Sequence, residues 1–156
     1  MTKTREIVKK LVDELGNGRE SLLPILQGII REERFLSPEA MREVAEKLDI
    51  SAAEVYGTAS FFSYLDTEER GQYVIRICKS VTCDLKGKCE IIDVMEDMLK
   101  IKVGETTVGK RFSLLETNCI GLCDQGPAML VNDDYYTKLT PTKVREILGT
   151  LIRNEN

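Results

Sequence analysis

Four of the five cysteines form two closely spaced pairs, and thiolates at such spacing are typical of metal ligands and redox groups. Four residues separate Cys78 from Cys83, and three separate Cys119 from Cys123. A 35-residue insert lies between the pairs. Each pair follows a predicted strand, so two loops at one end of a sheet would offer four thiolates at one point. This pattern favours a [2Fe–2S] cluster held by these four cysteines, and therefore single-electron transfer.

Other uses of the four cysteines stay open. A structural zinc ion also takes four cysteines, but its pairs are usually separated by about two to four residues, and the first pair here is at that limit. A thioredoxin-type dithiol needs the Cys-x-x-Cys spacing, which neither pair has. Unrelated buried thiols are a further alternative, although pairing on glycine-containing loops makes it less favoured.

The fifth cysteine and several neighbours of the pairs carry weaker predictions. Cys89 lies at the border of an apolar helical stripe, and we interpret it as a partly buried structural thiol rather than a fifth ligand. Gly121 and Gly126 are expected to let the backbone bend tightly and to bring amide N–H groups toward sulfur. Lysines beside the first pair would ease reduction, bind an acidic partner surface or simply be solvated: Lys79, Lys86 and Lys88.

The composition excludes several classes of function. The chain contains no histidine, which excludes Rieske ligation and any Ser-His-Asp or Cys-His catalytic site. Its net charge is −4, and neither half has the basic excess that nucleic-acid binding needs. The longest apolar stretch, residues 22–30, is interrupted by Pro24 and is shorter than the roughly 20 residues of a membrane span. Without a signal-peptide pattern, we expect a cytoplasmic protein with reduced thiols.

Residues 1–69 are predicted to form a helical bundle. A first apolar stripe at helical spacing ends near Gly16, and Ser21 is the candidate N-cap of a second helix. Ser37-Pro38 opens a third helix, and Ser51 with Glu54 has the capping-box spacing that opens a fourth. The polar stretch that follows indicates a domain boundary.

Residues 70–156 are predicted to form an α/β domain. Strands are expected over residues 72–77, 106–108, 112–116, 128–131 and 135–139. A helix is expected over residues 88–100, and a final helix is capped by Thr140-Pro141. The fold class is therefore α+β, with a helical bundle followed by an α/β cysteine-bearing domain.

The cysteine pattern behind a helical domain resembles the thioredoxin-like [2Fe–2S] subunit family of respiratory complex I and related soluble NAD-linked complexes. The resemblance covers nearly the whole chain, including Leu23-Pro24-Ile25-Leu26-Gln27, residues 55–62 and Leu139-Thr140-Pro141. The segment from Cys119 to Ala128 is most similar to the small subunit of electron-bifurcating [FeFe]-hydrogenase.

The resemblance implies a thioredoxin-like ferredoxin domain over residues 70–156 and a docking role for residues 1–69. It implies a non-catalytic electron-transfer subunit of an NAD(P)-linked oxidoreductase, expected to be an electron-bifurcating hydrogenase. The alternatives are the equivalent subunit of NADH:quinone oxidoreductase or of NAD-dependent formate dehydrogenase, a free-standing ferredoxin, and a zinc-stabilised interaction module. The implied partners are a flavoprotein subunit that carries FMN and binds NAD(H), and a further iron–sulfur subunit.

One departure from the family pattern concerns the second ligand. Many members read Gly-Thr-x-Cys-His there, whereas this chain has Ser80-Val81-Thr82-Cys83-Asp84. If the carboxylate of Asp84 lies near the cluster, we expect it to make reduction harder, because the reduced cluster is more negative.

Overall fold

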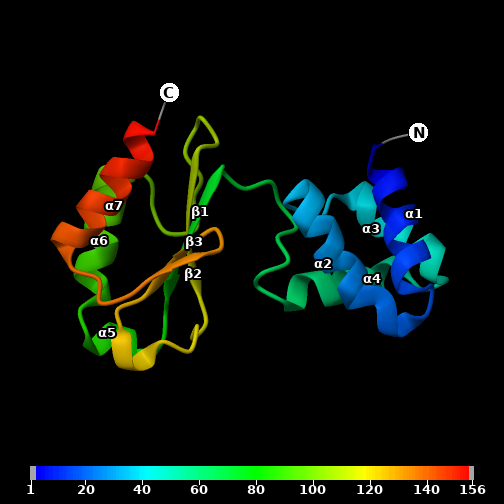
Figure 1. Ribbon diagram of the computed structural model, residues 1–156, viewed down its shortest axis with the longest axis horizontal. Helices are drawn as coiled ribbons and strands as arrows, with labels where there is room; N and C mark the ends of the chain where they lie inside the picture. The colour runs from blue at the N-terminus through cyan, green and yellow to red at the C-terminus, as the bar shows by residue number, and fades with distance from the viewer. Residues whose placement is uncertain (1–2, 155–156) are drawn as a thin grey trace. The chain divides into compact units, whose positions relative to one another are not determined.

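The computed structural model describes residues 3–154. The chain divides into two compact units, with the boundary between Glu69 and Arg70 (Figure 1). Each unit has its own apolar core. No helix among the described residues is long and apolar enough to cross a membrane.

Helices build the first unit. They are α1 (Lys3–Leu15), a short 3-10 turn η1 (Arg19–Ser21), α2 (Leu22–Glu33), α3 (Pro38–Leu48) and α4 (Ala52–Phe61) (Figure 1). Apolar side chains of all four α-helices form one core, with fully buried Val8, Ile25, Leu26, Ile29, Val44 and Val55 among its members. The apolar positions recur at helical spacing, so each helix turns one stripe inward.

Three of the predicted helix ends are confirmed. Gly16 has a φ of 92° and follows the last residue of α1, a left-handed conformation that glycine adopts without strain. The Ser37 hydroxyl accepts a hydrogen bond from the amide of Ala40 at 3.1 Å. The Ser51 hydroxyl accepts one from the amide of Glu54, also at 3.1 Å. Local side-chain bonds of this kind depend only on short sequence separations.

Ser21 stands at the N-cap position of α2 as predicted, but its side chain does not cap the helix. A 3-10 turn precedes α2, so Ser21 already has helical angles, with φ −83° and ψ −8°. Its hydroxyl donates a 2.7 Å hydrogen bond back to the carbonyl of Leu15 instead of accepting one from α2. Ser21 therefore joins the end of α1 to the start of α2.

A four-stranded sheet with helices on it forms the second unit. The strands are β1 (Tyr73–Cys78), β2 (Phe112–Thr117), β3 (Met129–Val131) and β4 (Asp134–Tyr136), in the order β2-β1-β3-β4. β1 and β2 are parallel, whereas β3 is antiparallel to both β1 and β4. Helices α6 (Lys88–Leu99) and α7 (Pro141–Arg153) lie side by side on the sheet (Figure 1). Their apolar stripes and the sheet share the second core.

The predicted strand over residues 106–108 is wrong. Thr106 forms only an isolated bridge with Ser113 of β2, and the amide of Thr107 donates to the carbonyl of Phe112 at 2.8 Å. The hydroxyl of Thr107 accepts hydrogen bonds from the amides of Arg111 and Phe112, at 3.1 and 3.0 Å. These bonds turn the chain back into β2 directly after Thr107, so the segment does not form a regular strand.

A helix that the sequence pattern does not predict begins between the cysteines of the first pair and includes the second of them, Cys83. It is α5 (Val81–Leu85), which follows Ser80 in extended conformation. Its first two residues, Val81 and Thr82, are β-branched and have low helix propensity, which hides the helix from the sequence pattern.

Candidate metal centre

The parallel pairing of β1 and β2 brings both cysteine pairs to one edge of the sheet. Cys78 is the last residue of β1 and lies opposite Thr117, the last residue of β2. Cys119 follows β2 by two residues. Because parallel strands end at the same edge, the two loops begin side by side. Cys83 then lies in α5, and Cys123 begins the 3-10 turn η2 (Cys123–Gln125).

The four thiols lie together in two contacting pairs. Cys119 Sγ and Cys123 Sγ are 3.1 Å apart. The thiols of Cys78 and Cys83 are hydrogen bonded to each other, and the thiol of Cys123 interacts electrostatically with all three others. The backbone amide of Ile120, in the second loop, donates to the sulfur of Cys78 in the first.

The grouping in pairs matches one kind of metal site. In a [2Fe–2S] centre each iron takes two protein ligands, so two contacting pairs of thiols fit its donor set. Within residues 3–154, no group of three or more His, Cys, Asp or Glu side chains has an arrangement that could hold a metal ion.

Burial differs between the pairs. Cys78 and Cys83 are 2% and 1% exposed, whereas Cys119 is exposed and Cys123 is half-buried. One pair is thus shielded from water and the other forms the surface of the site. The second loop is the part of the centre most open to solvent.

Hydrogen-bonding groups surround the sulfurs. The thiol of Cys78 donates to Ser80 Oγ at 3.2 Å, and the amide of Gly121 donates to Cys119 Sγ at 3.4 Å. Burial alone would raise the pKa of the Cys78 thiol, but the hydrogen bonds with Ser80, Cys83 and Ile120 together outweigh burial and lower this pKa. Contact with the thiol of Cys119 raises the pKa of Cys123. Hydrogen bonds to sulfur are one of the factors that set a cluster's potential.

The two glycines of the second loop serve different purposes. Gly121 has a φ of 82°, which favours glycine, and its amide reaches sulfur as expected. Gly126 has an ordinary φ of −68°. A Cβ atom there would lie 3.2 Å from Cys83 Sγ and 3.4 Å from the Cδ atom of Lys86. Gly126 therefore lets the two loops approach closely, and its conformation is not one that only glycine adopts.

Two of the three lysines beside the first pair point to other parts of the unit and are not simply solvated. Lys86 Nζ donates to the carbonyls of Cys123 and Asp124, at 2.9 and 3.1 Å. Lys88, with its side chain only 9% exposed, pairs with Asp84 and Glu116. Burial opposes its charge, but the hydrogen bonds to both carboxylates outweigh burial and raise the pKa of Lys88. Lys79 is exposed.

The interpretation of Cys89 as a partly buried thiol is wrong, because the side chain is exposed. The buried residues of α6 are Lys88, Ile91, Met95 and Leu99. Successive helical residues are turned by about 100°, so the residue after Lys88 faces away from this stripe. Cys89 stands apart from the four paired thiols.

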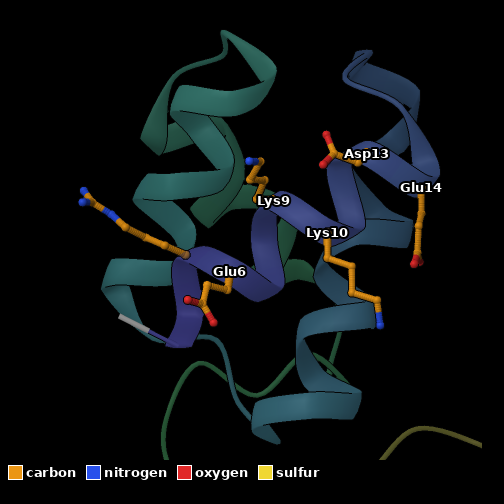
Figure 2. A pocket seen from close by; sticks show the side chains of 6 residues that line it. Glu6, Lys9, Lys10, Asp13 and Glu14 are labelled. Atoms are coloured by element: carbon orange, nitrogen blue, oxygen red, sulfur yellow. The ribbon is translucent and has the colours of Figure 1, made fainter. Parts of the chain in front are cut away.

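The first unit contains a surface hollow of about 520 Å³ along α1. Its lining is charged throughout: Arg5, Glu6, Lys9, Lys10, Asp13 and Glu14 (Figure 2). The three basic groups balance the three acidic groups, so the hollow selects neither an anion nor a cation. It lacks cysteines, and the cysteine cluster in the second unit remains the candidate site.

The family model for the thioredoxin-like [2Fe–2S] ferredoxin matches residues 8–152. Curated relatives named as a subunit of NADH-quinone oxidoreductase include the protein of Salmonella typhimurium, which is 40% identical over 144 residues, covering 92% of this chain and 87% of the relative. The Escherichia coli K12 protein is 34% identical with the same coverage. The Buchnera aphidicola protein is 40% identical over 121 residues, covering 77% of this chain and 75% of the relative.

Solved structures show the same fold. The NAD+-reducing [NiFe]-hydrogenase in its air-oxidised state aligns with 86% of this chain at a TM-score of 0.74 and 22% identity. This chain covers only 23% of the length of that hydrogenase chain. The predicted fold class, a helical part followed by a thioredoxin-like domain, is confirmed. A match that spans residues 8–152, together with relatives up to 40% identical over most of their length, shows that this chain belongs to the thioredoxin-like [2Fe–2S] ferredoxin family.

Proposed function

We propose that this chain is the [2Fe–2S] electron-transfer subunit of an NADH-quinone oxidoreductase of the complex I type. The relatives named for this oxidoreductase match nearly the full chain. The expected electron-bifurcating hydrogenase has less support, since it depends on one short segment after Cys119. The hydrogenase structure supports the fold alone, at 22% identity.

Cys78 and Cys83 would hold one iron, and Cys119 and Cys123 the other. The observation that carries this assignment is the contact within each pair, 3.1 Å between the sulfurs of the second. When bound, a [2Fe–2S] cluster accepts and donates one electron at a time. The four thiolates are soft ligands that suit iron–sulfur chemistry.

The chain's own residues set the conditions for that electron transfer. Burial of Cys78 and Cys83 excludes water from one side of the site. Amides of Ile120 and Gly121 donate to sulfur, and Lys86 and Lys88 place positive charge beside the two loops. These groups would favour the reduced state of the cluster, which is more negative than the oxidised state. Without histidine, the chain has little capacity for proton transfer, which suits a non-catalytic electron carrier.

The helical unit, residues 1–69, would bind a flavoprotein partner that carries FMN and binds NAD(H), next to a further iron–sulfur subunit. Support comes from the solvent-facing side of α4, which has no charged residue: Ala52, Ala53, Tyr56, Gly57, Ser60 and Phe61. Exposed helix faces are normally charged or polar. Tyr56 and Phe61 are 56% and 80% exposed, and aromatic side chains are enriched at protein interfaces. A complex of this kind would work in the cytoplasm.

Anaerobic purification with iron, sulfide and EPR analysis tests the cluster. We expect iron and acid-labile sulfide in equal amounts and a rhombic EPR signal after reduction. Zinc without sulfide would refute the cluster and favour a zinc-stabilised interaction module. Affinity purification of the native complex tests the role. A complex with no flavin-binding subunit would refute the role while leaving the cluster intact.

A further inference from the structure

We propose that Lys86 is a positioning residue that clamps the second ligand loop onto the first and adds positive charge beside the cluster. The inference rests on the proposed ligation by the four cysteines. Lys86 Nζ donates hydrogen bonds to two backbone carbonyls of the second loop, those of Cys123 and Asp124, at 2.9 and 3.1 Å. These carbonyls lie 37 and 38 residues further along the chain.

One end of this clamp is attached to the first ligand loop. The amide of Lys86 donates to the carbonyl of Cys83 at 3.2 Å, so its backbone is held directly after α5. Its aliphatic stem continues to the second loop, where Cδ lies 3.4 Å from the position a Cβ would take at Gly126. The same position is 3.2 Å from Cys83 Sγ. The lysine stem and a ligand sulfur thus pack against one glycine of the second loop.

The other end is a piece of backbone with little structure of its own. η2 (Cys123–Gln125) is a single 3-10 turn, in which the amide of Gln125 donates to the carbonyl of Leu122 at 3.0 Å. An ammonium that bonds to two adjacent carbonyls makes charge-assisted hydrogen bonds, which are stronger than neutral ones. Because the second pair is also the more exposed one, this loop is where the site would open to water and chelators first.

Lys86 would act in two separable ways. The two hydrogen bonds hold the loop, which protects the bound iron. The positive charge favours the reduced cluster, which is more negative by one unit. Lys79 allows the two effects to be separated. Lys79 lies beside Cys78 and is exposed, as Lys86 is, but within residues 3–154 its ammonium makes no hydrogen bond to the second loop.

The test compares cluster-loaded wild type with Lys86→Met, Lys86→Arg and the control Lys79→Met. Three quantities are measured: amide hydrogen exchange of residues 119–126, the rate at which a chelator bleaches the cluster, and the midpoint potential. For Lys86→Met we expect exchange and bleaching to be roughly tenfold faster and the potential to be more negative. Lys86→Arg, which keeps the charge and the donors, should restore all three. Lys79→Met should change only the midpoint potential and leave the exchange and bleaching rates as in wild type.

The clamp is refuted if Lys86→Met keeps wild-type exchange and bleaching rates, or if Lys79→Met accelerates them equally. A wild-type protein without iron and sulfide would instead refute the proposed function. In that case faster hydrogen exchange of residues 119–126 in Lys86→Met would still support the clamp, and unchanged exchange would refute it.

Discussion

Asp84 Oδ1 lies 2.7 Å from the ammonium of Lys88, and that ammonium is also 3.2 Å from Glu116 Oε1. The sequence alone predicts that the carboxylate after Cys83 makes reduction harder. The structure shows that a largely buried cation accompanies it. The charge of Asp84 therefore acts on the cluster together with the opposite charge of Lys88, which weakens the predicted effect.

Removing that cation should lower the reduction potential. Lys88→Met leaves two carboxylates without their partner, so we expect a shift of about 1 kcal/mol, or ~40 mV, toward negative potential. Asp84→Asn should shift the potential in the opposite direction. EPR-monitored redox titration measures both. Lys100→Met is the control, because Lys100 forms a comparable ion pair with Asp97 on the exposed surface. Equal shifts for Lys88→Met and Lys100→Met would contradict the prediction.

The same ion-paired lysine should make stability depend on alkaline pH. The pKa of Lys88 is raised above the usual 10.5 of lysine, because its bonds to Asp84 and Glu116 outweigh its burial. Its stabilisation is therefore complete below pH 10.5 and is lost as the pH rises through the raised value. Denaturant unfolding at several pH values should show the free-energy gap between wild type and Lys88→Met narrowing above that pH. A gap that stays constant up to about pH 12 would show that Lys88 is not linked to stability in this way.

Replacing a ligand should abolish the cluster, whereas replacing the isolated cysteine should not. Cys119→Ser removes a thiolate whose sulfur lies 3.1 Å from that of Cys123, so we expect most of the iron and the EPR signal to be lost. Cys89→Ser changes an exposed thiol outside the two pairs and should keep full iron content. Iron and sulfide analysis of both variants tests whether Cys119, and not Cys89, is a cluster ligand. Loss of iron in Cys89→Ser would place this residue among the ligands.

A single methyl group at Gly126 should disturb the centre. Its Cβ would lie 3.2 Å from Cys83 Sγ, so one loop must shift, at a cost of about 1–3 kcal/mol. In the Gly126→Ala variant, a chelator should therefore bleach the cluster faster than in wild type. The variant should also unfold at a lower denaturant concentration. Gly109→Ala is the matched control, since no atom lies within 4 Å of the added methyl. Identical behaviour of the two variants would show that the loops tolerate the extra volume.

Charging the uncharged face of α4 should weaken the binding of the flavoprotein partner. Phe61 is 80% exposed and packs edge-on against Phe62, with 5.0 Å between ring centres. For Phe61→Asp we expect roughly tenfold or greater loss of affinity, because aromatic anchors dominate interface energies. Val108→Asp, at an apolar position that is even more exposed, should leave affinity unchanged. Pull-down titrations compare them, with iron content as the check that the cluster is intact. Unchanged affinity for Phe61→Asp would exclude this face from the interface.

The sequence by itself determined the features that depend on near neighbours. Caps at Ser37, Ser51 and Thr140 are formed as predicted, because each hydroxyl bonds to an amide three residues away. Four of the five predicted strands overlap observed strands, although the one predicted over residues 135–139 ends at Tyr136, and the grouping of cysteines into pairs also followed from local pattern. The failed strand at residues 106–108 shows the limit of this reasoning, since the hydroxyl of Thr107 reverses a chain whose composition favours extension.

The tertiary structure decided what the residues around the cysteines do. Parallel pairing of β1 and β2 brings together two loops that are separated by 35 residues, and only then does Lys86 reach the carbonyl of Cys123. The ion pair of Lys88 with Glu116 spans 28 positions, so no helical spacing indicates it. Contacts across such separations depend on where strands and helices pack, and this explains why a lysine-rich loop is a structural part of the site.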